Sequence, residues 1–299
     1  MQKFDLKNTF PMIHDSLCNR VFFSGLLPER CPKAFQGLTA VLNKYNVPWS
    51  LLEGTKDIWC RDYMPLQVLP NRFVGYDYRP DYLLKTAKDR ASITDGKTVC
   101  KGLGYRCESW LGGTVLDGGN VVSAEGRVVM TSKIFEENPG VSIADCVHHL
   151  EMILGARLVV LPWDPAEEFG HADGICRYIG KGRILMTNYA QFDAKMAARF
   201  RRALKPHFTK VEELHFDCPK PHKFSWAYIN WLQTEQVLIL PKFGIQEDEQ
   251  AIEQISALMP DYAGRIEMVD ASDLVIHGGC FNCCSWTIRE EECYALPER

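Results

Sequence analysis

The sequence predicts an α/β protein built as a ring of five similar units, each with one helix and three short strands, around a pseudo-fivefold axis. Three observations support this prediction. Amphipathic helices and short apolar strands alternate along the chain, the third strands of several units share one pattern (RVVMTS, RILMTN and QVLILP), and four short motifs recur at near-constant spacing. A repeat of about 55 residues is typical of a closed array of small modules.

Four stretches carry apolar residues at three- and four-residue steps, the pattern of a helix with one buried face. Acidic residues or Ser stand near several of their starts, as they do at helix N-termini. A weaker fifth candidate is 81–93, which precedes a polar, Gly-containing stretch. The four clear stretches are 33–44, 142–154, 193–204 and 247–259.

Each predicted helix is followed by a short apolar strand, then by a motif segment of strand-like character, and then by a third strand. The first strands are VPWSLL, YRCESW, ARLVVLP, KVEELHF and RIEMVD, and the third strands are RFVGYDY, RVVMTSKIF, RILMTNYA and QVLILPKFG.

The last unit has little chain left for its third strand. Residues 20–28 (RVFFSGLLP) have the same pattern and lead into the first helix, so we expect this N-terminal strand to complete the unit and close the ring. Closure removes exposed sheet edges. The alternative is an ordinary α/β sheet with chance similarity among its strands, and the ring is favoured because one pattern accounts for all five units.

Composition is that of a folded protein with no nucleic-acid or membrane partner. The 299 residues contain 46% hydrophobic residues and no obvious linker, and the ring makes 1–299 one domain. The net charge of −4 comes from interspersed acids and bases, which gives no electrostatic case for nucleic acid or an anionic membrane. No stretch approaches the roughly 20 apolar residues of a membrane span, and the first residues lack the apolar core of a signal peptide. We therefore expect a cytoplasmic protein.

The 12 cysteines are scattered along the chain. Without an export signal we expect them to be reduced, most of them as small buried apolar residues. No CxxC pair is followed by a second at zinc-finger spacing, so the sequence predicts no structural zinc site.

The four motifs are WCRDYMP at 59–65, LDGGN at 116–120, GHADG at 170–174 and HGGCFNCC at 277–284. In a ring the middle segments converge on the axis, so one motif from each unit can contribute to a shared pocket. The fourth unit contributes FSWAYINWLQ (224–233). The side chains expected to meet are Asp62, Asp117, His171, Asp173, Cys283 and Asn230.

Cys283 follows two glycines, which permit a close backbone approach to a ligand. A thiolate is a strong nucleophile, and a nearby imidazolium or bound cation lowers the thiol pKa. Cys280 and Cys284 compete for this role. Since neighbours on a strand point to opposite faces, we expect only one of 283 and 284 to face the pocket.

His171 and Asp173 are two residues apart and would share one face of a strand, which suits an imidazole that moves protons beside a carboxylate. Asp62 and Asp117 lie among aromatic and apolar residues, where a buried carboxylate needs a cation or a hydrogen-bond network. Arg61 precedes Asp62, so the alternative for this acid is a structural ion pair elsewhere in the ring. Adjacent strand residues point apart, however, which leaves Asp62 free for the pocket.

Three carboxylates with one Cys and one His indicate a substrate that is cationic, planar and electrophilic at carbon. A guanidinium fits, because carboxylates bind its N–H groups in bidentate fashion. Cys283 would attack the central carbon, His171 would protonate the departing amine, and water would hydrolyse the covalent intermediate. This chemistry requires no metal and no cofactor.

At these motifs the chain resembles the guanidino-group-modifying enzymes, most closely agmatine deiminases and the related bacterial, Porphyromonas-type peptidylarginine deiminases. WCRDYMP is similar to their W-x-R-D-x-G-P, LDGGN to E-G-G-[SN], GHADG to G-H-V-D and HGGCFNC to G-G-G-N-I-H-C. The likeness covers most of the chain in motif order and spacing. It implies the five-bladed α/β propeller called the pentein fold.

The resemblance implies Cys283 as nucleophile, His171 as general acid and base, and Asp62 and Asp173 as guanidinium ligands in the catalytic set. Further candidates for substrate contacts are Asp117, Trp59 and Asn230. The chain departs from the family pattern at several positions: Asp117 stands where the family has Glu, Met64 replaces Gly, and Cys280 and Asn282 replace the Asn and His before the nucleophile.

The leading hypothesis is a hydrolase (deiminase) of a small-molecule guanidine such as agmatine or an arginine derivative. An amidinotransferase with the same site stays open, because the acceptor depends on pocket access and not on the nucleophile. A non-catalytic propeller is disfavoured by the retained Cys and His. A metal hydrolase is disfavoured because no second histidine stands at ligand spacing, although His277 could be recruited. The oligomeric state stays open, a homo-oligomer included.

Overall fold

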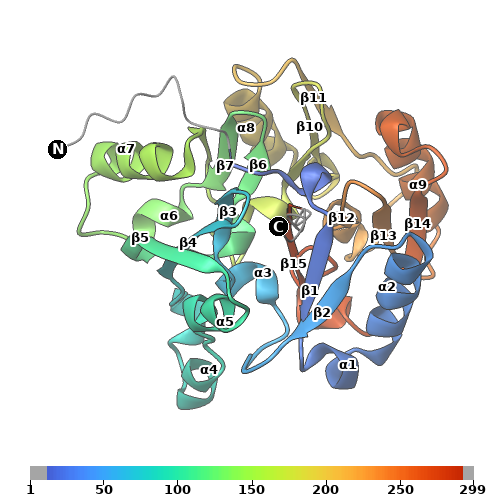
Figure 1. Cartoon of the computed structure of the whole chain (residues 1–299). Coiled ribbons are helices and arrows are strands. Elements are labelled where there is room, and N and C mark those ends of the chain that lie inside the picture. Colours follow the sequence, from blue (N-terminus) through green and yellow to red (C-terminus); the bar gives the residue numbers. More distant parts are fainter. Residues whose placement is uncertain (1–11, 292–299) are drawn as a thin grey trace, which may run out of the picture.

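The computed structural model describes residues 12–291, and across this range the strands form five three-stranded sheets. The sheets follow one another around a common centre, with helices on the outside (Figure 1). In order of hydrogen bonding they are β15 (Ser285–Ile288), β1 (Arg20–Ser24) and β2 (Trp49–Leu52); β3 (Leu66–Leu69), β4 (Arg72–Asp77) and β5 (Arg106–Val115); β6 (Val122–Ala124), β7 (Arg127–Thr131) and β8 (Arg157–Leu161); β9 (Cys176–Tyr178), β10 (Arg183–Met186) and β11 (Lys210–Glu213); and β12 (Leu232–Gln233), β13 (Leu238–Lys242) and β14 (Ile266–Asp270).

All five sheets share one pairing pattern. The central strand pairs antiparallel with the strand that follows a motif and parallel with the strand that follows a helix. The fold prediction is confirmed, and so is the role of the N-terminal strand. β1 is the central strand of the sheet that contains β15, with Phe22 opposite Trp286 on one side and Ser50 on the other.

One helix connects the central strand of each sheet to its parallel neighbour. These helices are α2 (Pro32–Lys44), α5 (Gly96–Gly102), α7 (Ile143–Leu154), α8 (Ala194–Leu204) and α9 (Glu247–Leu258). Ser142 and Asp193 accept backbone N–H bonds at the beginnings of α7 and α8, as expected of capping residues, whereas the side chains at the N-cap positions of α2 and α9 make no such bond. The remaining helices are short: α1 (Leu27–Arg30), α3 (Cys60–Tyr63), α4 (Ala87–Ala91) and α6 (Lys133–Glu136).

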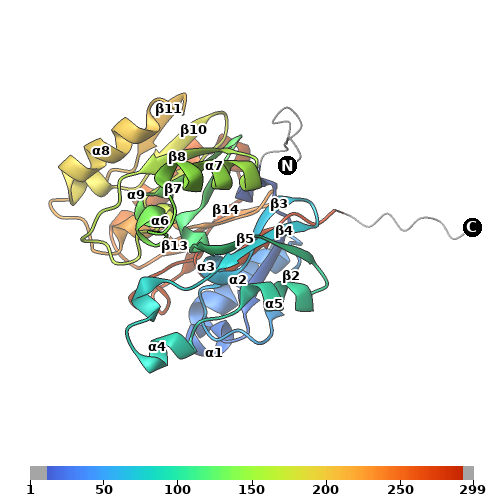
Figure 2. The ribbon, with the colours of Figure 1, turned by 90° about the vertical axis from the view of Figure 1, so that its left-hand side faces the viewer.

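The four clear helix predictions are confirmed, and the fifth is corrected. Residues 81–93 contain only a 3-10 turn (Asp81–Leu83) and the short α4, and this segment extends away from the β3–β4–β5 sheet (Figure 2). The helix of the second unit is α5, in the stretch that looked polar and Gly-rich. Asp95 caps it, and Gly96 packs where a Cβ would lie 1.8 Å from the carbonyl oxygen of Tyr63.

The motif segments are not strands, which corrects the sequence-based expectation. Each is a short helical turn that ends just before its strand, and in each an N–H bonds to the carbonyl three residues earlier. The donors are the backbone nitrogens of Asp62, Asn120, Ile175, Asn230 and Ser285, with N–O distances between 3.0 and 3.2 Å.

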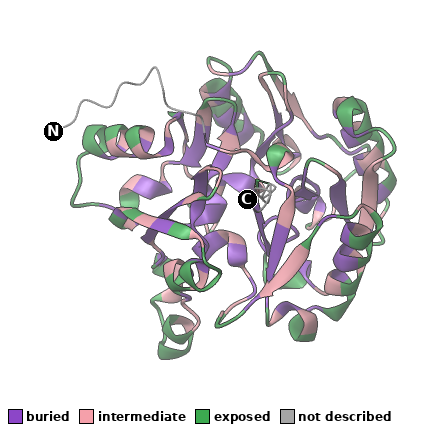
Figure 3. Cartoon of the chain, viewed as in Figure 1, coloured by how far each residue is buried: buried purple, intermediate pink, exposed green. Residues whose placement is uncertain are grey.

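Buried residues gather on the central strands, and exposed residues on the outer helices (Figure 3). On α8, for example, Met196, Ala197, Phe200 and Leu204 face the core at helical spacing. The described cysteines are all free, and all except Cys218 are buried. Among residues 12–291, no helix is long and apolar enough to cross a bilayer.

Candidate active site

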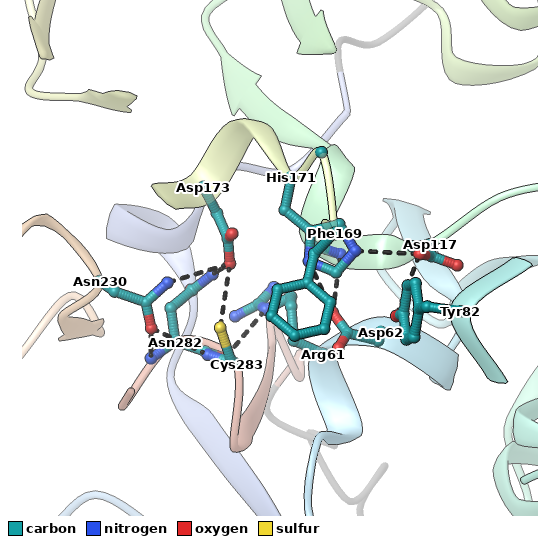
Figure 4. A network of polar contacts seen from close by, with 12 residues as sticks. Arg61, Asp62, Tyr82, Asp117, Phe169, His171, Asp173, Asn230, Asn282 and Cys283 are labelled. Carbon is teal, nitrogen blue, oxygen red and sulfur yellow. Dashed lines mark hydrogen bonds and ion pairs between the residues drawn. The ribbon is translucent and has the colours of Figure 1, made fainter. Parts of the chain in front are cut away.

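The motif turns of the five units meet at the centre of the molecule (Figure 4). Cys283 comes from the last unit, Asp173 and His171 from the third, and Asp62 from the first. Residues separated by more than 200 positions are thereby brought into contact, as the ring predicts.

The Cys283 thiol lies beside Asp173. Its Sγ is 3.6 Å from Asp173 Oδ2, and its side chain lines the central cavity. Burial raises the pKa of the Cys283 thiol well above its usual value, and the carboxylates of Asp173 and Asp62 raise it further. The resting residue is therefore a thiol. Cys284 points into the core instead, with its Sγ 3.6 Å from the carbonyl oxygen of Phe281.

His171 lies between two carboxylates. Its Nε2 is 2.9 Å from Asp117 Oδ2, and its Nδ1 is 3.7 Å from Asp62 Oδ1. Burial by itself lowers the pKa of His171, but Asp62 and Asp117 outweigh burial and raise this pKa to about 10. At neutral pH the ring is an imidazolium, with Nε2 donating to Asp117.

Asp62 and Asp173 are both buried and differ in their partners. Asp62 Oδ1 accepts the backbone N–H of Gly119 at 3.1 Å. Burial raises the pKa of Asp62 to about 8; His171 opposes this shift, whereas Asp117 and Asp173 add to it. The site thus contains more buried carboxyl groups than cationic side chains, which is the electrostatic character of a cation-binding site.

Asparagine side chains hold Asp173 in place. Asp173 Oδ2 accepts from Asn282 Nδ2 at 2.7 Å and from Asn230 Nδ2 at 3.2 Å. Asn230 Oδ1 also accepts the backbone N–H groups of Asn282 and Cys283, at 3.1 and 3.2 Å. Asn230 therefore connects the carboxylate to the backbone of the cysteine turn.

Sequence reasoning did not select Asn282, although it adjoins Cys283 in the last motif. Its contact with Asp173 depends on how the turn directs the side chain, which the motif alone does not reveal. Arg61 and Asp62 point apart, as expected, and the pairing of Arg61 with Asp15 at 3.6 Å is an additional finding.

A second group of residues lies behind His171 and Asp117. Tyr82 donates to Asp117 Oδ2 at 3.2 Å. Lys133 is buried, lies 3.0 Å from Asp81, and donates to the carbonyl oxygen of Phe169 at 3.0 Å. These contacts tie the 81–83 turn and the backbone before His171 to α6. Neither Tyr82 nor Lys133 lies in a motif, so no sequence pattern singles them out.

A cavity of about 520 Å³ opens from this centre, and its wall includes Cys283, His171 and Asp173. The other predicted site residues (Asp62, Asp117, Asn230 and Trp59) lie outside the cavity wall. Trp59 packs against Gly279, where an added Cβ would lie 2.6 Å from its ring. Among the described residues, no three His, Cys, Asp or Glu side chains are grouped so that they could hold a metal ion.

The fold and the Cys–His–Asp centre define an α/β propeller of the pentein type. A family model described as Porphyromonas-type peptidyl-arginine deiminase matches residues 38–288, and the chain belongs to this family. The resemblance inferred from the motifs is thereby confirmed.

Curated relatives match at low identity. The agmatine deiminase of Pseudomonas savastanoi pv. phaseolicola is 26% identical over 212 residues, which cover 57% of this chain and 56% of that protein. The agmatine deiminase of Pseudomonas putida is 25% identical over 220 residues, covering 60% and 58%. The match thus spans little more than half the length of these relatives.

Solved structures match over nearly the whole chain. The C. jejuni agmatine deiminase has a TM-score of 0.71 at 17% identity, with 97% of this chain and 99% of that chain covered. The Enterococcus faecalis agmatine deiminase has a TM-score of 0.69 at 18% identity, covering 95% and 97%. An amidinotransferase from Microseira wollei has a TM-score of 0.58 at 12% identity, covering 95% and 97%. At these identities the similarity establishes the fold.

Proposed function

We propose that this protein is a hydrolase of a small guanidine, releasing ammonia and leaving a ureido product. The observation that carries the proposal is the grouping of Cys283, His171 and Asp173 on the wall of one cavity, with the buried Asp62 carboxylate 3.7 Å from His171 Nδ1 just outside that wall. A guanidinium placed there supplies the positive charge that the buried carboxylates lack.

In the first half of the reaction, the bound guanidinium lowers the pKa of the Cys283 thiol, whose proton leaves to solvent. The thiolate forms a C–S bond to the central guanidine carbon. The His171 imidazolium then donates its proton to one –NH₂ group, and the C–N bond breaks as ammonia departs. An amidino group remains attached to the sulfur.

In the second half, neutral His171 takes a proton from water while the water oxygen attacks the same carbon. The C–S bond breaks, the thiolate returns, and the remaining hydroxyl proton passes to ammonia. One guanidinium and one water give one ureido compound and one ammonium ion. Asp117, bonded to His171 Nε2, stabilises the imidazolium at both ends of the cycle.

The test is a screen of the chain for ureido product with agmatine, arginine, methylated arginines, guanidino acids, arginine peptides and simple alkyl- and arylguanidines. We expect at least one to be converted. C283S should abolish conversion while keeping the thermal unfolding temperature, and C284S should retain activity. An active C283S variant would contradict the proposed nucleophile, and an inactive screen would contradict the hydrolase.

A second candidate is amidino transfer, in which an amine attacks the amidino-enzyme in place of water. The fold shared with an amidinotransferase supports keeping this candidate. It predicts that an added amine suppresses ureido product and appears as a new guanidine, which mass spectrometry of the reaction mixture detects.

A further inference from the structure

The cavity extends well beyond the reacting side chains, and its outer wall is aromatic. A guanidinium head occupies a small part of about 520 Å³, so most of the cavity is available for the rest of a substrate. The apolar lining residues form what we call the tail wall: Trp163, Phe169, Ile175, Tyr189, Phe192 and Trp226.

Two indole rings of the tail wall flank the motif that carries His171 and Asp173. Trp163 packs on Gly170, where an added Cβ would lie 3.0 Å from the ring, and Trp226 packs over Gly174 at 3.8 Å. Glycine at 170 lets the Trp163 ring lie close against the backbone, whereas the Trp226 ring is at ordinary contact distance from Gly174. The tail wall therefore begins next to the reacting groups and continues outward.

Phe192 lies at the outer part of the same wall and is 51% exposed. Phe192 thus continues the apolar lining of the cavity to the molecular surface.

Charged residues of both signs line the cavity beside the tail wall. Two acids among them, Asp164 and Glu167, already accept hydrogen bonds. Asp164 accepts from the Tyr189 hydroxyl and from the backbone N–H of Ala166. Glu167 accepts the backbone N–H groups of Phe169 and Gly170. These bonds hold the segment before His171. Lys223 also lines the cavity, away from the His171 imidazolium in the sequence and on a different unit of the ring.

We propose that the tail wall makes this site selective for guanidines with an uncharged apolar tail, alkyl or aryl, over tails that end in an ammonium or an amino-acid group. An ammonium would lose water beside the aromatic rings and would lie near Lys223. Cation–π contact and the charges of Asp164 and Glu167, which already accept bonds from their own loop, offset this cost only in part. A carboxylate would meet Asp164 and Glu167. An apolar tail gains from burial without either cost.

This inference rests on the proposed function, and one isosteric pair tests it. Agmatine and n-pentylguanidine differ only in the group that ends the tail, an ammonium in one and a methyl in the other. We expect kcat/KM for ureido formation to be at least about tenfold higher for n-pentylguanidine, with 2-phenylethylguanidine also preferred over agmatine and arginine. An equal or lower value for n-pentylguanidine than for agmatine would overturn the inference.

A variant pair assigns the preference to the tail wall. The quantity to compare is kcat/KM for n-pentylguanidine divided by kcat/KM for methylguanidine. W226A should lower this ratio by about tenfold or more, and W226F should restore most of the lost preference. W110A is the matched control, since Trp110 stacks on Arg72 at 3.9 Å outside the cavity and should leave the ratio unchanged. An unchanged ratio in W226A would contradict the role of this residue.

Binding separates this inference from the proposed function. Calorimetric titration of C283S with n-pentylguanidine and with agmatine measures the tail preference without turnover. Tighter binding of n-pentylguanidine with no turnover by the wild type would overturn the hydrolase and keep the tail preference. Turnover with a preference for agmatine would keep the hydrolase and overturn the tail preference. If neither compound binds, both the hydrolase and the tail preference are overturned.

Discussion

His171 lies between two carboxyl groups of the candidate site, those of Asp117 and Asp62. Asp117 and Asp62 approach its two ring nitrogens at 2.9 and 3.7 Å. Burial lowers the pKa of His171, but the two carboxylates raise it to about 10, while burial raises the pKa of Asp62 to about 8. The proposed reaction needs an ionised Asp62 and a protonated His171. Both conditions hold between these two values.

We therefore predict a bell-shaped dependence of kcat/KM on pH. It should rise as pH increases through about 8, where Asp62 ionises, and fall through about 10, where His171 loses its proton. D117N removes a carboxylate that raises the pKa of His171, so its alkaline limb should move down by about 1 pH unit or more. Initial rates across pH 5–11 measure both limbs. A wild-type maximum below pH 7, or an unmoved limb in D117N, would contradict the charge assignment.

At the scale of elements, the five motif turns explain what the sequence could and could not predict. The repeat spacing identifies which segments meet. It does not identify their conformation, because so short a turn has no periodicity of its own, and the pattern around it predicts a strand. Adjacent side chains in a helical turn point about 100–120° apart, according to whether the turn is α or 3-10. For this reason Arg61 still diverges from Asp62, and Cys284 from Cys283, although strand alternation was the wrong reason.

The Gly119 turn is packed tightly against the centre, which leads to a prediction. A Cβ on Gly119 would lie 2.5 Å from Asp62 Oδ1 and 2.6 Å from His171 Nδ1. G119A should displace these side chains and lower kcat by about 100-fold, with a folded protein by circular dichroism. G140A is the control, because no atom lies within 4 Å of the added Cβ. Full activity in G119A would show that the position of the Asp62–His171 pair does not matter.

At the scale of the whole molecule, the ring was predictable and the cavity wall was not. Five repeats of one pattern, and an N-terminal strand that fits the incomplete unit, were sufficient for the fold. The tail wall comes from connections that differ between units, such as 163–169 and 223–226, and no repeat relates them. The same holds for Tyr82, whose segment extends from the second unit only.

The segment before β1 also contributes to the centre. Asp15 lies 2.7 Å from Arg177 and 3.6 Å from Arg61, and it accepts from the Thr287 hydroxyl at 3.0 Å. Burial by itself raises the pKa of Asp15, but the two arginines outweigh it and lower this pKa. Three units of the ring are connected through this one carboxylate.

We predict that D15N lowers the free energy of unfolding at pH 7 by about 2 kcal/mol, because it leaves two buried guanidinium groups without their carboxylate. Since the folded-state pKa of Asp15 is lowered, the contribution is present above pH 4 and is lost as pH falls through that lowered value. Urea unfolding measures the difference. D261N, which breaks an exposed pair with Lys181, should stay within about 0.5 kcal/mol of the wild type. A D15N protein as stable as D261N would contradict this role.

The central claim is that the Cys283 sulfur carries the amidino group during turnover. Rapid acid quench of the wild type with a guanidine that it converts, followed by peptide mapping by mass spectrometry, tests this directly. We predict an amidino adduct on the peptide that contains Cys283, located on that residue, present in C284S and missing in C283S. Product formation with no adduct, or with the adduct on another cysteine, would contradict the account.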